Sequence, residues 1–141
     1  MTKEFAFDKY ISDTFRSIGI MPNVKGYQYL SYAVKLVVDA GKMLKITREV
    51  YPEVAKHFCV TSVQVERAIR HAITTCWGRV KTENKMNNVN RIFGRDTLCL
   101  EYHPTNGALI SLLVDNIMLI YQSNLYIDQE SQANPLCHVQ C

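Results

Sequence analysis

The sequence predicts an all-α domain of six helices that contains a helix-turn-helix and is unrelated to the winged-helix folds. Apolar residues recur at spacings of three and four along most of the chain, as on one face of an α-helix. Glycines at positions 19, 41 and 94 follow these segments, where helices commonly end. Strand-like alternation is confined to residues 97–102 (TLCLEY), which fit a short strand and an extended loop equally well.

The first two helices are predicted over residues 5–18 and 25–40. In the first, apolar residues at positions 7, 11, 15 and 18 share one face, and Gly19 ends the helix. The connector contains MPN at residues 21–23. The second helix ends at Gly41, and its apolar face consists of Tyr27, Leu30, Ala33, Val34, Val37 and Val38.

The third helix is predicted over residues 47–58, and the break before the fourth is only residues 59–61. Pro52 fits a helix only within about its first turn, because its ring removes a backbone N–H donor. The buried side of this helix is expected to comprise Val50, Val54, Ala55 and Phe58. After the break, Thr61 followed three residues later by Gln64 predicts a capping box at the start of the next helix.

The fourth helix has two contrasting faces and, with the third, is predicted to form a helix-turn-helix over about residues 47–78. At 100° per residue its apolar residues gather on one side, namely Val65, Ala68, Ile69, Ala72, Ile73 and Cys76. The other side and its flanks carry Gln64, Glu66, Arg67, Arg70, His71 and Thr74. Such a charged face is most often simply solvated, although a helix of this kind also fits the major groove of DNA. Trp77 ends the buried side, so we expect it in the core.

The last third of the chain predicts two more helices. A short one is expected among residues 81–93, which are polar but include four apolar residues, and Gly94 ends it. The final helix is expected to begin at Thr105 or Asn106, either of which can cap it, and to end at about Gln122. These limits give one helical domain at residues 1–122, followed by a tail at residues 123–141 that we expect to be mobile.

Positive charge is concentrated in one part of the sequence. The chain has a formal net charge of +3, but residues 62–95 hold seven Lys or Arg against two Glu, a local balance of +5. The rest of the chain therefore sums to −2. This distribution is typical of a surface that binds a polyanion. For residues 79–95 alone, a patch against the DNA backbone and a solvated connector are equally good interpretations.

Several function classes are disfavoured by what the sequence lacks. The N-terminus carries charges where a signal peptide needs an apolar region, and the longest apolar run, near residues 108–121, contains Asp115. The five cysteines have irregular gaps, and neither residues 57–59 nor residues 137–141 show the paired spacing of a structural zinc site. No glycine-rich phosphate loop or nucleophile–base pair is indicated. We therefore expect a cytoplasmic protein with reduced thiols, no metal, no cofactor and no catalytic residue.

The charged side of the fourth helix has the chemistry needed to read bases. The arginine guanidinium can pair with O6 and N7 of guanine, and a carboxylate can accept a hydrogen bond from N4 of cytosine. A carboxylate that faced only phosphates would be repelled. Glu66 between Arg67 and Arg70 therefore indicates base reading in addition to charge attraction.

Several strings of this sequence resemble one known family. They are RSIGIMPNV (16–24), VKGYQYL (24–30), VYPEVAKHF (50–58), VERAIRHAI (65–73) with Trp77, Phe93-Gly94 and HPTN (103–106). The chain closely resembles, over about residues 11–121, the DNA-binding effector domain of the stage-zero sporulation protein A family of bacterial regulators. The resemblance implies a six-helix domain with a helix-turn-helix, acting as a sporulation transcription factor.

The resemblance also implies a DNA site, site residues and partners. Glu66, Arg67 and Arg70 would enter the major groove of a TGTCGAA-like element on duplex DNA. Thr61, Gln64 and His71 would contact base edges or phosphates. Copies of the domain would sit in tandem on adjacent elements and touch the RNA polymerase sigma subunit, to activate or to repress transcription.

Three features depart from the family pattern. The family's N-terminal receiver domain is missing from this sequence, in which few residues precede the first predicted helix, and a protein without a receiver and an isolated effector domain are equally good interpretations. Gln64 stands where the family's reading helix carries a basic residue, and the segment between Trp77 and Phe93 is longer by a few residues. These departures leave an alternative, an interaction module that modulates a full-length paralogue or the sigma subunit. The intact set of Glu66, Arg67 and Arg70 favours DNA binding.

Overall fold

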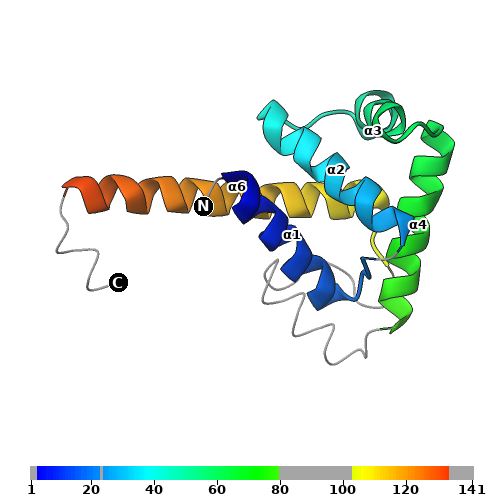
Figure 1. Cartoon of the computed structure of the whole chain (residues 1–141), viewed down its shortest axis with the longest axis horizontal. Helices are drawn as coiled ribbons and strands as arrows, with labels where there is room; N and C mark the ends of the chain where they lie inside the picture. Colours follow the sequence, from blue (N-terminus) through cyan, green and yellow to red (C-terminus); the bar gives the residue numbers. More distant parts are fainter. Residues whose placement is uncertain (1–2, 23, 80–102, 134–141) are drawn as a thin grey trace.

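The computed structural model describes residues 3–22, 24–79 and 103–133 of the 141-residue chain. Within these ranges the regular elements are all helical (Figure 1): α1 (Lys3–Ile18), α2 (Lys25–Ala40), the π-helical turn η1 (Ile46–Val50), α3 (Tyr51–Phe58), α4 (Ser62–Arg79) and α6 (Asn106–Ala133). The prediction of an all-α fold is confirmed for this part of the chain, with five α-helices. The helix predicted among residues 81–93 and the strand or loop at residues 97–102 lie outside the described residues.

The two N-terminal helices end where their glycines predict. α2 has the predicted bounds, and α1 begins at Lys3, slightly before the predicted start. Gly19 and Gly41 adopt φ angles of 91° and 72°, in the left-handed region that glycine enters without steric cost. The backbone N–H of Gly41 donates to the carbonyl of Val38, which closes the last turn of α2.

The third predicted helix is divided into η1 and α3. The N–H of Val50 donates to the carbonyl of Lys45 at 3.1 Å, and that of Tyr51 donates to Ile46, both across five residues. Such wide turns are π-helical. Pro52, the second residue of α3, has no N–H to donate back into this turn, which is consistent with the widening.

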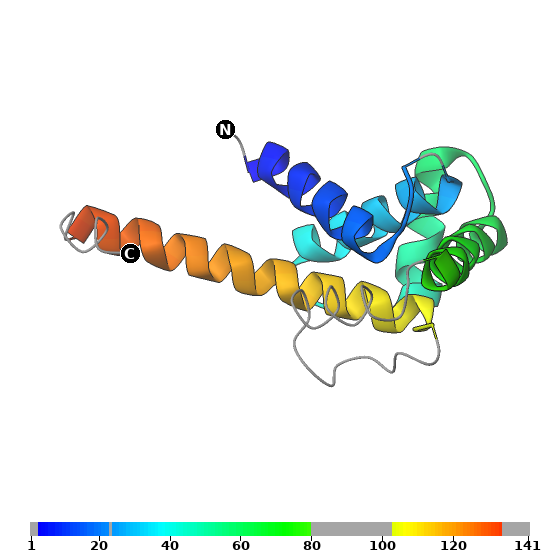
Figure 2. The same ribbon diagram turned by 90° about the horizontal axis from the view of Figure 1, so that it is seen from below.

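α2 occupies the middle of the helical body and packs against α3, α4 and α6 (Figures 1 and 2). The core draws side chains with almost no solvent exposure from every described helix, from η1 and from the connector after α1; they include Phe15, Ile18, Ile20, Leu30, Val34, Val37, Val50, Val54, Ile69, Ile73, Leu109, Ile110 and Leu113. α2 comes very close to α4 at Gly26, where a Cβ would lie only 2.3 Å from the carbonyl oxygen of Ala68. The absence of a side chain at this position therefore sets the separation of the two helices.

α6 is longer than the sequence pattern predicts. It continues to Ala133, past the end expected at about Gln122, and its C-terminal part extends beyond the other helices in both views (Figures 1 and 2). The reason is local: residues 123–133 contain no glycine or proline, and the first strong helix breaker is Pro135. The division into a domain at residues 1–122 and a tail remains a prediction. None of the described helices is long and apolar enough to cross a membrane.

Candidate nucleic-acid interface

A sharp three-residue connection joins α3 to α4. Cys59 ends α3 in the left-handed conformation, with φ 57° and ψ 44°, and is the one non-glycine residue with positive φ in the described part of the chain. The N–H of Val60 then donates to the carbonyl of Ala55 at 3.0 Å. The carbonyl of Ala55 also accepts from the N–H of Cys59, so two hydrogen bonds to this carbonyl close the end of α3. The chain thereby turns within residues 59–61, the break that the sequence predicts.

The start of α4 is held by the predicted capping box, which is confirmed. The N–H of Gln64 donates to Oγ1 of Thr61 at 3.1 Å, and the N–H of Thr61 donates to Oε1 of Gln64 at 2.8 Å. Both residues are exposed. The reciprocal pair uses the side-chain oxygen of Gln64 but leaves its amide N–H groups available to a ligand.

The two predicted faces of α4 are confirmed. Val65, Ile69 and Ile73 have no solvent exposure, and Ala72 and Cys76 are nearly as buried. On the other side Gln64, Arg67, Arg70 and His71 are exposed and Glu66 is partly buried. The six predicted site residues, Thr61, Gln64, Glu66, Arg67, Arg70 and His71, therefore line the first three turns of one helix and its cap. Trp77 is 6% exposed and belongs to the core, as predicted.

An ion pair joins two of these site residues on the surface of α4. Arg70 donates from its guanidinium to the carboxylate of Glu66, one turn earlier in the helix. The side chain of Arg70 remains 62% exposed and that of Glu66 26% exposed. The guanidinium has five N–H donors in a planar fork, so most of its hydrogen-bonding capacity stays available beside the carboxylate.

The turn of α4 that carries Glu66 is also held by a contact with the first residue of α6. Asn106 is only 8% exposed, and its Nδ2 donates to the backbone carbonyl of Glu66 at 3.1 Å and to the hydroxyl of Tyr51 at 3.0 Å. The cap of α6 is Thr105, whose Oγ1 accepts from the N–H of Ala108 at 3.1 Å. Asn106 is thus free to join the first residue of α3 to α4. Its role was not predicted, although it lies within the HPTN string.

The environment of Tyr51 connects this buried group to the charged face. Burial raises the pKa of the Tyr51 hydroxyl above its ordinary value of 10.0, and the hydrogen bond from Asn106 and the positive charge of Arg70 partly offset that rise. The hydroxyl consequently stays protonated at neutral pH. Through Asn106, which also donates to the carbonyl of Glu66, the Tyr51 hydroxyl is joined to the turn of α4 that carries the basic face.

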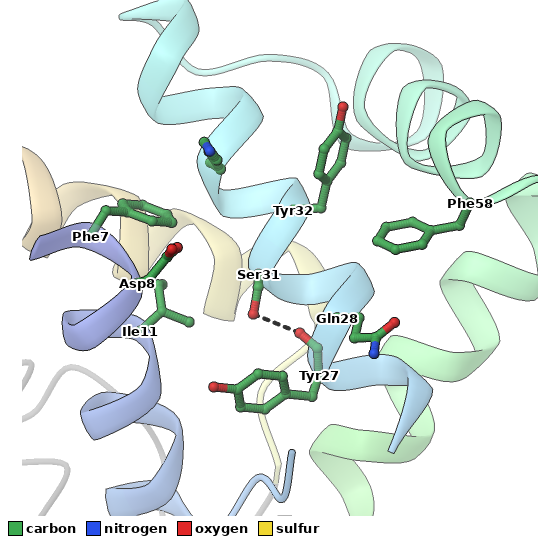
Figure 3. Close-up of a pocket in the computed structure, with 9 residues that line it drawn as sticks. Phe7, Asp8, Ile11, Tyr27, Gln28, Ser31, Tyr32 and Phe58 are labelled. Carbon is green, nitrogen blue, oxygen red and sulfur yellow. Dashed lines mark hydrogen bonds between the residues drawn. The ribbon is translucent and has the colours of Figure 1, made fainter. Parts of the chain in front are cut away.

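A groove elsewhere on the molecule is separate from this face. It has a volume of about 380 Å³ and lies mainly between α1 and α2 (Figure 3). Its lining is Phe7, Asp8, Ile11, Tyr27, Gln28, Ser31, Tyr32, Lys35 and Phe58. None of the predicted site residues lines it. The ring of Tyr32 stacks on His57 at 4.1 Å between ring centroids, so that aromatic packing consolidates the region beside the groove.

Residues 11–117 match the family model described as the C terminal of sporulation initiation factor Spo0A. The matched segment begins within α1 and ends within α6, and it includes α3, α4 and all six predicted site residues. It covers well over half of the 141 residues. The family resemblance predicted from the sequence is therefore confirmed.

Proposed function

The chain belongs to the Spo0A C-terminal family of DNA-binding regulatory domains, which is not a family of enzymes, and on this premise we propose that it reads duplex DNA through a helix-turn-helix made of α3 and α4. The observation that carries the proposal is the outer face of α4. Two arginines stand exposed on it, directly opposite a buried apolar stripe. A helix held in this way can enter the major groove while the body stays outside.

The proposed roles follow from the chemistry of each side chain. Arg67 and Arg70 donate to O6 and N7 of guanines, and Glu66 accepts from N4 of a cytosine. Thr61 and His71, at the two ends of the face, contact phosphates or base edges. Gln64 donates through its amide N–H groups, because the capping box already uses its oxygen.

Two features of the fold support a fixed reading geometry. The capping box sets the first turn of α4, and Asn106 holds the carbonyl of Glu66 from the opposite side. Side chains used to read bases must be held to within a fraction of an ångström, and this requires support from the surrounding structure. The basic face has both supports.

We further propose the biological setting that the family suggests. The domain acts as a cytoplasmic transcription factor of sporulation, on TGTCGAA-like elements, with copies in tandem and in contact with the polymerase sigma subunit. Its output is activation or repression of transcription. The alternative of an interaction module makes a different prediction for DNA, and the following measurement separates the two.

The test is a fluorescence-anisotropy titration at physiological salt with a duplex that carries TGTCGAA and a scrambled duplex of equal length. A preference of about tenfold or more for the element, roughly 1.4 kcal/mol, is expected for sequence reading. Equal and weak binding to both duplexes would refute base reading by α4 and favour the interaction module. Salt must be held constant, because phosphate contacts alone change affinity steeply with ionic strength.

A further inference from the structure

Val63, the second residue of α4, is an exposed apolar side chain at the candidate interface. It is 57% exposed, and the other exposed large apolar residues in the described part of the chain are Met21, Met43 and Leu119. Of these, only Val63 lies in α4. The charge pattern that singles out Glu66, Arg67 and Arg70 gives no role in DNA binding to this uncharged side chain.

The helical spacing aligns Val63 with the two arginines. Positions 63, 67 and 70 are separated by four and three residues, so their side chains fall on one stripe of α4. The stripe lies opposite Val65 and Ile69, which have no solvent exposure. A DNA duplex that meets Arg67 and Arg70 therefore also meets Val63, one turn closer to the helix N-terminus, which is the end that reads bases in helix-turn-helix proteins.

A single exposed valine is unremarkable on most surfaces, but two properties distinguish this one. Valine is a weaker helix former than alanine, so an exposed helix position gains nothing from it in local stability. In addition, its χ1 is almost fixed in a helix, so that both methyl groups point in a set direction. On a stripe that is otherwise polar and basic, a rigid apolar side chain can pack against an apolar group of the DNA while the arginines bind its polar groups.

Duplex DNA offers one apolar group to the major groove, the 5-methyl of thymine. We propose that Val63 packs against a thymine methyl and so helps to select a T·A pair beside the bases that Arg67 reads. The proposal rests on the DNA-binding function proposed above and adds a second kind of contact to it. It assigns a methyl contact to Val63, while the arginines and Gln64 supply hydrogen bonds.

The contact can be tested by removing the methyl from the DNA. The TGTCGAA duplex is compared with duplexes in which each thymine of either strand is replaced singly by deoxyuridine, which lacks only the 5-methyl. The wild-type chain is expected to lose about fourfold in affinity at one thymine, the effect of exposing roughly one methyl-sized group. Val63→Ala is expected to bind the thymine and uracil forms of that position equally well.

Met43→Ala is the matched control, because it also truncates an exposed apolar residue but lies outside α4. It should keep the full wild-type response to uracil. The proposal is overturned if the uracil series is flat for the wild-type chain, or if Val63→Ala responds to uracil as strongly as the wild type. If the wild-type chain does not prefer TGTCGAA over the scrambled duplex, the DNA-reading function itself fails, and the Val63 contact fails with it.

Discussion

Substituting Gly26 by alanine should push α2 and α4 apart where they pack against each other. A Cβ at this position would lie 2.3 Å from the carbonyl oxygen of Ala68 and 2.6 Å from the Cβ of Ala72. Ordinary contacts are about 3.3–3.6 Å for carbon to oxygen and about 3.5–4.0 Å for carbon to carbon. The neighbouring atoms belong to the backbone and the first side-chain atom of α4, and neither can rotate away. The helices must therefore move apart by roughly 1 Å.

The cost of this movement exceeds the gain from alanine. Overpacking a core costs about 1–3 kcal/mol, and a rigid clash with backbone places this case near the upper end. Alanine recovers at most about 1 kcal/mol of helix propensity relative to glycine. The net loss is then about 2 kcal/mol. With a urea m-value of about 2 kcal/mol/M, the unfolding midpoint should fall by about 1 M.

Gly107→Ala provides the control, since Gly107 is also the second residue of a helix, α6. The nearest atom to its added Cβ is Cγ1 of Ile46 at 3.9 Å, an ordinary contact. This variant should unfold at the wild-type midpoint or above it. Urea titrations followed by circular dichroism at 222 nm measure both. A Gly26→Ala midpoint equal to or higher than that of the wild type would refute the argument from close packing.

Four further predictions concern the contacts that hold α4 in place and the DNA-reading face proposed for it. Thr61→Ala should lower the free energy of unfolding by about 1 kcal/mol through loss of the cap, whereas Thr61→Ser, which keeps the hydroxyl, should lower it much less in the same urea titration. Asn106→Ala leaves the Tyr51 hydroxyl and the Glu66 carbonyl without their buried partner and should cost about 1–3 kcal/mol; an unfolding midpoint unchanged from wild type would show that the bridge is dispensable. Because burial raises the pKa of Tyr51 in the folded state, this tyrosine ionises more readily in the unfolded state, and the wild type should lose stability as pH rises from 9 to 11. Tyr51→Phe lacks the hydroxyl, so its free energy of unfolding should rise relative to that of the wild type over the same range. A difference between the two that is independent of pH would contradict the raised pKa. Arg70→Ala should reduce affinity for the TGTCGAA duplex by about 10- to 100-fold and affinity for scrambled DNA far less; equal losses would reduce Arg70 to a phosphate contact.

The fold was predictable wherever short-range signals decide it. The bounds of α2 follow from helical spacing and Gly41, and the cap of α4 follows from the Thr61–Gln64 spacing, because each is a contact between residues close in sequence. The end of α6 was not predictable in the same way. A polar composition after residue 122 suggested a tail, but polarity alone does not terminate a helix, and the next breaker is Pro135.

For the candidate site too, features set within one helix could be predicted, and features set by contacts between distant helices could not. The exposure of Arg67 and Arg70 follows from the angle between residues on one helix, and so could be predicted. The bridge from Asn106 could not, because its partners lie 40 and 55 positions away in sequence. Local pattern gives no information on such pairs, since they depend on how complete helices pack. From the sequence, a polar residue at the start of a helix, such as Asn106, is most simply interpreted as the cap. Here the neighbouring Thr105 is the cap instead.

If α4 reads DNA as proposed, the ion pair between Glu66 and Arg70 has a consequence for how that face meets specific and non-specific sites. The pair is exposed at Arg70, and pairs of this kind contribute only about 0–1 kcal/mol, so the guanidinium can leave the carboxylate at little cost. A bidentate contact with guanine is worth about 1–3 kcal/mol of discrimination, which exceeds that cost. A phosphate offers attraction without sequence information, and the adjacent carboxylate weakens it by repulsion. In the proposed reading mode, Glu66 would therefore disfavour non-specific contacts of Arg70 more than specific ones, because only at the correct base pairs would both side chains find partners.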